Sequence, residues 1–309
     1  MPKRRLSESI PEALPLCDGP KLGLFPHHDA ARIQWLERLD VGDDGRRISS
    51  EGCVYRAVIH GREYAIKVVG RPRENAPLPR YMETNCGHAF RFSDLVQFFQ
   101  PYEHGIFLGA LLGRDTPLDT AAFYTDPFYR ECRAYGRIHE AIRRRELKAD
   151  VAVACHGYFF LQTKDQQILN NHNIDLRLDM VDLDYQSATI GGCRPRAIVK
   201  DLASSDSGVT GKNLGRLLHN LSRLNRAGVY NSDIHLNNYK DGKIIDFGSS
   251  WTEPNPLLDA WGKITNWLEK MGDRIRFDEM VTKEGIPNPK KVKARHSMTL
   301  RSTTKLLAK

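Results

Sequence analysis

The sequence contains no apolar run near the roughly 20 residues that a membrane-spanning helix needs. Its longest apolar pieces are short, namely IFLGALL at residues 106–112 and GYFFL at residues 157–161. The first residues, MPKRRLSESIPEALPL, include basic side chains but no continuous apolar segment behind them, so they are not a secretory signal. We therefore expect an intracellular protein, nuclear or cytoplasmic, with no membrane partner.

Paired cysteines and internal repeats are missing as well. The six cysteines, at positions 17, 53, 86, 132, 155 and 193, form no CxxC pair and no Cys/His spacing of the metal-binding type. This scatter indicates reduced thiols in an intracellular protein. With 309 residues, of which 40% are hydrophobic and 27% charged, the chain is predicted to be globular with one or two sizeable cores.

Acidic residues are absent from the end of the chain. Residues 288–309 contain seven Lys and Arg residues and no acid, so of the formal charge of +8 only 8 − 7 = +1 belongs to the rest. Because Pro287 and Pro289 interrupt any helix before this basic tail, we expect it to be extended and dispensable for folding. Solvation alone is the simplest interpretation. Contact with nucleic acid or an acidic protein, or nuclear import, stays open and slightly favours the nucleus.

The first half of the chain is predicted to be rich in β-strands. Asp29 can cap a short helix with Ile33, Leu36 and Leu39 on one face. Residues 52–69 predict a hairpin that turns at residues 60–63 and places Lys67 among apolar neighbours on the second strand. Residues 70–125, rich in Pro, Gly and aromatic residues, are interpreted as an insertion. Two further strands are predicted from HGYFFLQT at residues 156–163 and RAIVKDL at residues 196–202.

Three helices are predicted in addition. The first begins with Asp126 as N-cap and proline at the next position. The second lies within residues 211–230 and ends at Gly228. The third runs from residue 257 to about residue 275. Their apolar faces are, in order, Phe128, Cys132, Tyr135 and Ile138 or His139; then Leu214, Leu217, Leu218, Leu221 and Leu224; then Leu258, Trp261, Ile264, Leu268 and Met271.

One motif carries the chemistry, NSDIHLNNYKDGKIIDFG at residues 231–248. It supplies Asp233, then Asn238 five residues later, then Asp246 directly before Phe-Gly. Carboxylate and amide oxygens at this spacing can hold Mg²⁺ against a nucleotide. With YAIK, which ends at Lys67, and with Glu131 on the helix that Asp126 begins, the motif resembles the protein-kinase family.

The resemblance implies an α+β, two-lobed protein-kinase-like fold with a β-rich N-lobe and a shortened helical C-lobe. We expect an irregular segment at 1–28, an N-lobe at 29–202 with the insertion at about 70–125, a C-lobe at 203–287 and the basic tail at 288–309. A narrower resemblance, from about residue 19 to about residue 252, is to fungal kinase-like proteins grouped with the Fta-two subunit of the Sim-type kinetochore complex. It rests on GPKLGLF, EGCVYRAVIHGREYAIKVV, DPFYRECRAYGRI and the NY that closes the catalytic loop.

The kinase resemblance also implies roles for single residues, with ATP and Mg²⁺ as cofactors. Lys67, held by Glu131, would contact the phosphates, and Asn238 and Asp246 would bind the metal. The catalytic residues would be Asp233, which takes the proton of an acceptor hydroxyl, and His235 beside it. The remaining cofactor-binding residues implied are Gly52, Val54 and Ala65.

Several family features are replaced or missing. Arg47 and Ser49 stand at the positions of the first two glycines of the phosphate-covering loop, which predicts weakened nucleotide contact. The His-Arg-Asp triplet is Asn231-Ser232-Asp233, so an arginine that would answer a phosphorylated activation loop is lacking. His235 replaces the usual lysine. No APE motif follows DFG, and 309 − 248 = 61 residues remain, so a peptide substrate would have little surface to lie on.

Three functions therefore stay open. The chain could bind Mg-ATP and slowly transfer the γ-phosphoryl group to a Ser or Thr hydroxyl. It could be a catalytically silent pseudokinase that serves as a kinetochore or scaffold component with protein partners. The spacing Asp-x-His-x-x-Asn, at residues 233–238, is also similar to small-molecule kinases of the aminoglycoside and choline type, although those carry a histidine where this chain has Asn231.

Overall fold

The computed structural model describes residues 14, 18–26, 32–41, 52–69, 120, 123–124, 126–171 and 195–294. Nearly all of the predicted insertion at 70–125 lies outside these residues. So do Arg47, Ser49 and the last part of the basic tail, from residue 295 onward. Among the helices that are described, none has the length and apolar character that crossing a membrane requires.

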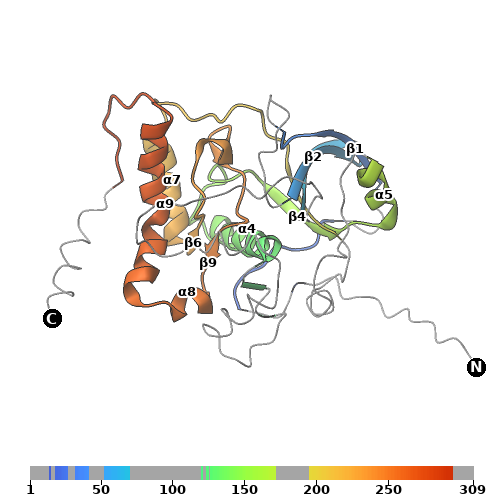
Figure 1. Cartoon of the computed structure of the whole chain (residues 1–309), viewed down its shortest axis with the longest axis horizontal. Coiled ribbons are helices and arrows are strands. Elements are labelled where there is room, and N and C mark those ends of the chain that lie inside the picture. The colour runs from blue at the N-terminus through green and yellow to red at the C-terminus, as the bar shows by residue number, and fades with distance from the viewer. Residues whose placement is uncertain are drawn as a thin grey trace, which may run out of the picture.

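A five-stranded antiparallel sheet forms the right-hand part of the molecule in Figure 1, in the order β1-β2-β3-β5-β4. The strands are β1 (Ile33–Arg38), β2 (Gly52–Ile59), β3 (Arg62–Val69), β4 (Cys155–Phe160) and β5 (Arg196–Asp201). The predicted hairpin is β2–β3. Its two turn residues, His60 and Gly61, have φ angles of 51° and 77°, as expected for a two-residue turn that follows the twist of the strands.

Strand β1 corrects the helix that we predicted from Asp29. Ile33 and Trp35 are buried on one face, Gln34 between them is exposed, and the strand pairs with β2. The helical interpretation relied on Leu39, which is 37% exposed. The ring nitrogen of Trp35 donates to Asp165 of α5 (Thr163–Asn171), 3.3 Å away. The edge of β2 and a partner for Trp35 therefore decide this conformation, and both are distant in sequence.

Helix α4 (Pro127–Arg143) lies at the centre of the molecule, between the sheet and the helical half (Figure 1). It begins where the sequence predicts, because the Asp126 carboxylate accepts a hydrogen bond from the backbone N–H of Phe128 at 2.8 Å. The apolar face predicted for this helix is buried.

Residues 18–26 pass across α4 and β4. Leu22 N donates to the carbonyl of Cys132 on the helix, and Phe25 N donates to the carbonyl of Tyr158 on β4. Gly136 permits the close approach, since a Cβ there would lie 2.5 Å from the backbone of Lys21. This irregular segment is therefore packed against both the helix and the sheet.

The helical half contains α7 (Leu214–Arg226), α8 (Pro256–Ala260) and α9 (Lys263–Lys283). Helices α7 and α9 lie side by side at the left of Figure 1. Two small ribbons complete this half: β6 (Val229–Tyr230) pairs with β9 (Trp251–Thr252), and β7 (Tyr239–Lys240) pairs with β8 (Lys243–Ile244). One apolar core extends from α4 into this half, and a second lies between the sheet and α5. The molecule thus has the predicted α+β, two-lobed, kinase-like fold with a shortened C-lobe.

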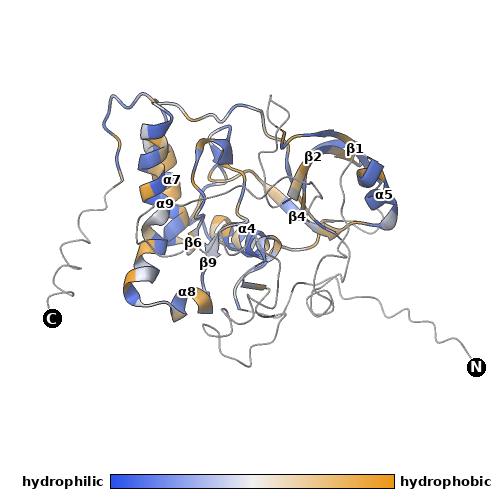
Figure 2. Cartoon of the chain, viewed as in Figure 1, coloured by the Kyte–Doolittle hydropathy of each residue, from blue (hydrophilic) through white to orange (hydrophobic). Residues whose placement is uncertain are grey.

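The last predicted helix is wrong in two respects. It is two helices, because Asn255 caps α8 by accepting from the N–H groups of Leu257 and Leu258, and the chain turns again before α9. Its predicted apolar stripe is buried at Leu258 but not in α9, where Ile264 and Leu268 are 50% and 46% exposed. The residues that α9 buries are Asp273, Phe277, Met280 and Val281. Figure 2 accordingly shows mixed hydrophilic and hydrophobic residues along α9.

The packed part of the chain continues beyond residue 287, where we predicted the tail to begin. Ala294 is buried, and its N–H donates to the Asp278 carboxylate of α9 at 2.9 Å. Asn288 exchanges two hydrogen bonds with the backbone of Val292. Residues 288–294 are therefore held by hydrogen bonds among themselves and to α9.

Candidate functional site

A buried ionic network joins the two lobes. Lys67 on β3 places its Nζ 3.0 Å from Glu131 Oε2 on α4, and 2.7 and 2.8 Å from the two carboxylate oxygens of Asp246, which follows β8. Lys67 is 2% exposed and Glu131 is fully buried, whereas the Asp246 side chain is 27% exposed. The ion pair predicted between Lys67 and Glu131 is therefore present, and Asp246 is brought to the same ammonium group.

The environment of Asp246 favours its ionised form. Burial works against the charge, but the ammonium groups of Lys67 and Lys200 outweigh it and lower the pKa of the Asp246 carboxyl. Asp246 Oδ1 also accepts from the N–H of Gly248 at 2.8 Å. This carboxylate consequently stays negative at neutral pH and can bind a cation.

Sequence reasoning missed the second lysine of the network, Lys200 on β5. Its Nζ contacts Glu131 Oε1, lies 2.6 Å from the carbonyl oxygen of Ile245 and sits 5.4 Å from the ring centre of Tyr135. Paired residues of neighbouring strands share a face of a sheet. The pairing of Ala65 with Lys200 therefore puts both lysines on the face that α4 covers. A lysine inside the apolar run RAIVKDL was the available signal, of the same kind that singled out Lys67.

The residues predicted to form a catalytic loop lie next to this network. The side-chain amide nitrogen of Asn238 donates to the backbone carbonyl and to Oδ2 of Asp233, both at 2.8 Å. Asn231 donates to the carbonyl of Asp246 at 2.6 Å and accepts from the N–H of Asp233 at 3.1 Å. The residue that replaces the usual histidine thus connects the loop that carries Asp233 with the segment that carries Asp246.

Asp273 on α9 holds the loop that carries Asp233 through hydrogen bonds, and the sequence alone does not single it out. Its carboxylate accepts from the N–H groups of Asn231 and Ser232 at 2.8 and 2.7 Å, and from the Asn225 side chain at 2.7 Å. Asp273 is fully buried, and this burial raises the pKa of its carboxyl. An acid beside the buried Phe277 was the only hint in the sequence. The loop therefore takes its position from a helix about 40 residues later.

His235 lies beside Asp233, with its Nε2 3.4 Å from Asp233 Oδ2 and both side chains about half exposed. The hydrogen bond to Asp233 raises the pKa of the imidazole. His235 therefore carries its positive charge to a higher pH than a free histidine would. It can in part replace the missing lysine as a cation at this position.

The residues predicted around the nucleotide base lie on the same face as Lys67. Val54 on β2 pairs with Lys67, and both Val54 and Ala65 are half-buried. Gly52 lies at the start of β2 and pairs with Val69. The Asp40 carboxylate accepts from the N–H of Val54 at 3.0 Å and thereby fixes the strand there. Val54 and Ala65 thus lie as partly exposed apolar side chains on the face of the sheet that carries Lys67.

The family model "Kinetochore Sim4 complex subunit FTA2" matches residues 10–251, which is more than half of the chain. The chain belongs to the FTA2 family. The match ends at residue 251, so α8 and α9 of this FTA2-family chain lie outside the matched region.

The chain was also compared with curated proteins and with solved structures. No curated protein matches the chain. Among the solved structures that match, one is titled "Structure of vaccinia related kinase 3" and is 10% identical, with a TM-score of 0.31 over 78% of this chain and 54% of that one. The FTA2-family chain therefore spans about half the length of that kinase chain.

The donors at the site of this FTA2-family chain fit a hard divalent cation in type. Within the described ranges, no three His, Cys, Asp or Glu residues are grouped as metal ligands. The available oxygens are the Asp246 carboxylate, which is partly exposed, and the amide oxygen of Asn238, whose nitrogen is bound to Asp233. Mg²⁺ typically takes one or two such protein ligands and completes its shell with phosphate oxygens and water. The residues are therefore suitable, provided that Lys67 shares Asp246 with the metal.

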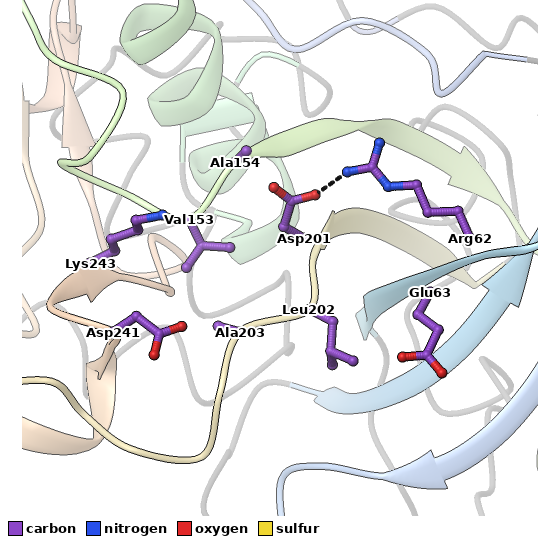
Figure 3. Close-up of a pocket in the computed structure, with 9 residues that line it drawn as sticks. All are labelled: Arg62, Glu63, Val153, Ala154, Asp201, Leu202, Ala203, Asp241 and Lys243. Carbon is purple, nitrogen blue, oxygen red and sulfur yellow. Dashed lines mark hydrogen bonds and ion pairs between the residues drawn. The ribbon is translucent and has the colours of Figure 1, made fainter.

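A cavity of about 320 Å³ lies at the end of β5, among the residues that Figure 3 draws. Its wall includes Arg62, paired with Asp201 at 2.6 Å, as well as Lys243 and Asp241. None of the predicted site residues lines it. Because no residue of the network at Lys67 lines it, this cavity is separate from that network.

Proposed function

We propose that this kinase-like FTA2-family protein binds Mg-ATP between its lobes and slowly transfers the γ-phosphoryl group to a Ser or Thr hydroxyl. The observation that supports this most is the grouping of Lys67, Glu131 and Asp246 within 3.0 Å contacts, with Asn238 and Asp233 hydrogen-bonded beside them. A chain that had lost all use for a nucleotide would have no need to keep these polar residues in register.

Binding would use the charges already present. Lys67 would turn part of its hydrogen bonding from Asp246 to the phosphates, while Glu131 keeps the ammonium group close. Asp246 and Asn238 would then supply the protein oxygens for Mg²⁺. The metal, when bound, neutralises phosphate charge and helps to orient the transferred group. The base would lie against Val54 and Ala65.

Transfer would depend on Asp233. Asn238 donates to Oδ2 of Asp233 and so fixes the carboxylate, whose Oδ1 can accept the proton of the attacking hydroxyl. His235 would place a positive charge near the transferred phosphate in its protonated form. Since that charge is lost as the pH rises through the raised pKa of His235, the site is a weaker catalyst at neutral pH than one that carries a lysine.

Nucleotide binding and catalysis can be tested separately. Mg-ATP at 100 times its dissociation constant should stabilise the protein by roughly 2.7 kcal/mol, measured as a thermal shift. Asp246→Asn should remove this shift. Asp233→Ala should keep it and abolish turnover in a radiolabelled-phosphate assay with a peptide acceptor. No shift with millimolar Mg-ATP would refute the enzyme proposal, and labelling of choline or an aminoglycoside in place of peptide would identify a small-molecule kinase.

The second candidate function is that of a scaffold subunit in a nuclear kinetochore complex. The exposed stretch of α9 favours it. Ile264 and Leu268 are about half exposed and one helical turn apart, and Lys263 and Arg274 lie along the adjacent row of the helix. This surface suits an apolar partner segment with acidic flanks. The basic tail could add contacts to nucleic acid or acidic proteins.

Reconstitution tests the scaffold function. The pair of substitutions Ile264→Glu and Leu268→Glu should prevent co-elution with purified subunits of the Sim4 complex in size-exclusion chromatography. Ile168→Glu on α5 is the matched control, because Ile168 is similarly exposed at 39% but lies on the other lobe. If all variants co-elute equally, the α9 surface is not the docking site. A fluorescent fusion that stays outside the nucleus would contradict the kinetochore role.

A further inference from the structure

The ionic network contains two lysines and two carboxylates, and the hydrogen bonds are divided unevenly among them. Lys67 donates to both oxygens of Asp246, at 2.7 and 2.8 Å. Glu131 receives its hydrogen bond from Lys200, on Oε1. Its other oxygen, Oε2, lies 3.0 Å from Lys67 Nζ but has no hydrogen-bond partner among the described residues. Glu131 is thus tied to Lys200 more firmly than to Lys67.

We propose that Lys200 is the positioning residue that anchors Glu131, and with it α4, so that Lys67 is left to serve Asp246 and the phosphates. This inference rests on the proposed nucleotide binding only for what Lys67 does, because the anchoring of α4 needs no ligand. In the kinase pattern a single lysine makes both contacts. In this chain Lys67 keeps its 3.0 Å ion pair with Glu131, but Lys200 on the neighbouring strand supplies the hydrogen bond to that carboxylate.

The surroundings of Lys200 suit an anchor. The ammonium group reaches Glu131 on α4 and the carbonyl of Ile245, the residue directly before Asp246. It lies over the ring of Tyr135, one helical turn after Glu131, and the residue is only 6% exposed. Tyr135 in turn packs edge-on against Phe247, with ring centres 5.1 Å apart. Lys200 therefore joins α4 and the segment around Asp246 by both a charged and an aromatic contact.

The balance of charges in the network supports the role of Lys200 as the anchor of Glu131. Lys67 and Lys200 carry two positive charges, and Glu131 and Asp246 carry two negative ones, all within one buried cluster. If Lys67 turned toward a phosphate, Glu131 would still have a partner at hydrogen-bond distance. Since a buried carboxylate without a partner is strongly unfavourable, Lys200 allows Lys67 to move while α4 stays in place. No phosphorylated loop is then needed to hold the helix inward.

Hydrogen exchange of the nucleotide-free protein tests the anchor. We expect Lys200→Met to speed amide exchange in α4 by about tenfold or more, because opening of a local unit controls its exchange. Lys67→Met should change α4 exchange by less than about threefold. A double-mutant cycle adds a second measurement: Glu131→Gln should couple more strongly to Lys200→Met than to Lys67→Met. Equal α4 exchange in the two lysine variants, or equal coupling, would overturn the proposal.

A second pair of variants and a nucleotide-binding measurement complete the test. Should Lys200→Met not fold, Lys200→Gln and Lys67→Gln remove the charge but keep a polar side chain, and faster α4 exchange is expected only for Lys200→Gln. If both glutamine variants keep α4 protected, the anchoring role is refuted. Mg-ATP binding is measured in parallel. Failure of the wild-type chain to bind Mg-ATP would refute the proposed function and leave the anchor standing, whereas failure of the exchange pattern would refute the anchor alone.

Discussion

Replacement of Asp273 by asparagine should loosen the loop that carries Asp233. The carboxylate accepts three hydrogen bonds: Oδ2 from the Asn225 side chain and the Asn231 N–H, and Oδ1 from the Ser232 N–H. An asparagine oxygen can replace only one of these acceptors. If it takes the place of Oδ2, the amide nitrogen faces the N–H of Ser232, and two donors then meet.

The magnitude follows from these contacts. A buried donor left without an acceptor costs about 1–3 kcal/mol, and each of the two remaining bonds loses about 1 kcal/mol when its acceptor becomes neutral. The sum is about 3–5 kcal/mol. Burial raises the pKa of Asp273, which means that part of the charge's cost is relieved when the charge is removed. We therefore expect a net loss of about 2–4 kcal/mol in the free energy of unfolding.

Urea unfolding measures this loss as a lower midpoint at an unchanged slope. Asp278→Asn on the same helix is the control, because Asp278 accepts from the N–H of Ala294 near the end of the packed chain and should cost about 1 kcal/mol. Nucleotide binding should weaken in Asp273→Asn alone. A loss below about 1 kcal/mol for Asp273→Asn would show that the loop holds its shape without this carboxylate.

Three further outcomes are expected. Gly136→Ala should destabilise the fold by about 1–3 kcal/mol, since the added Cβ meets the Lys21 backbone. Gly215→Ala on α7, where nothing lies within 4 Å of the added Cβ, should stabilise the fold slightly. Equal effects of the two substitutions in urea unfolding would disprove the close packing of Gly136 on Lys21. Because the folded pKa of Asp246 is lowered, this residue contributes stability at a pH above the unfolded pKa of 3.8, and that stability is lost as the pH falls through the folded pKa. The free energy of unfolding should therefore depend less on pH in the acid range in Asp246→Asn than in the wild type. Identical pH curves would argue against the stabilisation of the Asp246 carboxylate by the two lysines. A chain that ends at residue 294 should keep its melting temperature, while one that ends at residue 286 should melt a few degrees lower; no difference would mean that the contact of Ala294 with α9 contributes little.

Much of the site could be predicted because its residues are close in sequence or belong to one motif. The order of Asp233, Asn238 and Asp246 along the chain limits how far apart they can lie once the loop closes. Lys67 was identifiable as a charge on a strand with apolar neighbours. Glu131 followed from the resemblance to protein kinases, in which a glutamate on the helix after the hairpin pairs with the strand lysine.

Lys200 and Asp273 could not be found in the same way. Each is a single charged residue outside the motif, and its importance comes from burial against elements 40 to 70 positions away. Sequence periodicity predicts which residues share one face of a helix or strand, but not which other element packs against that face. The stripe through Ile264 and Leu268 has perfectly regular helical spacing, yet α7 packs against α9 nearer its C-terminal end. Strand β1 was misjudged for a related reason, since its partner β2 settles the conformation.

Residues 18–26 give α4 a mechanical connection to the beginning of the chain. The hydrogen bond from Leu22 ends on Cys132, the residue directly after Glu131, and the backbone of Lys21 lies against Gly136 one turn later. The same short segment is bonded to β4 through Phe25. Because residues 21 and 22 contact α4 and Phe25 contacts β4, any displacement of this segment would move the helix that carries Glu131 together with the sheet.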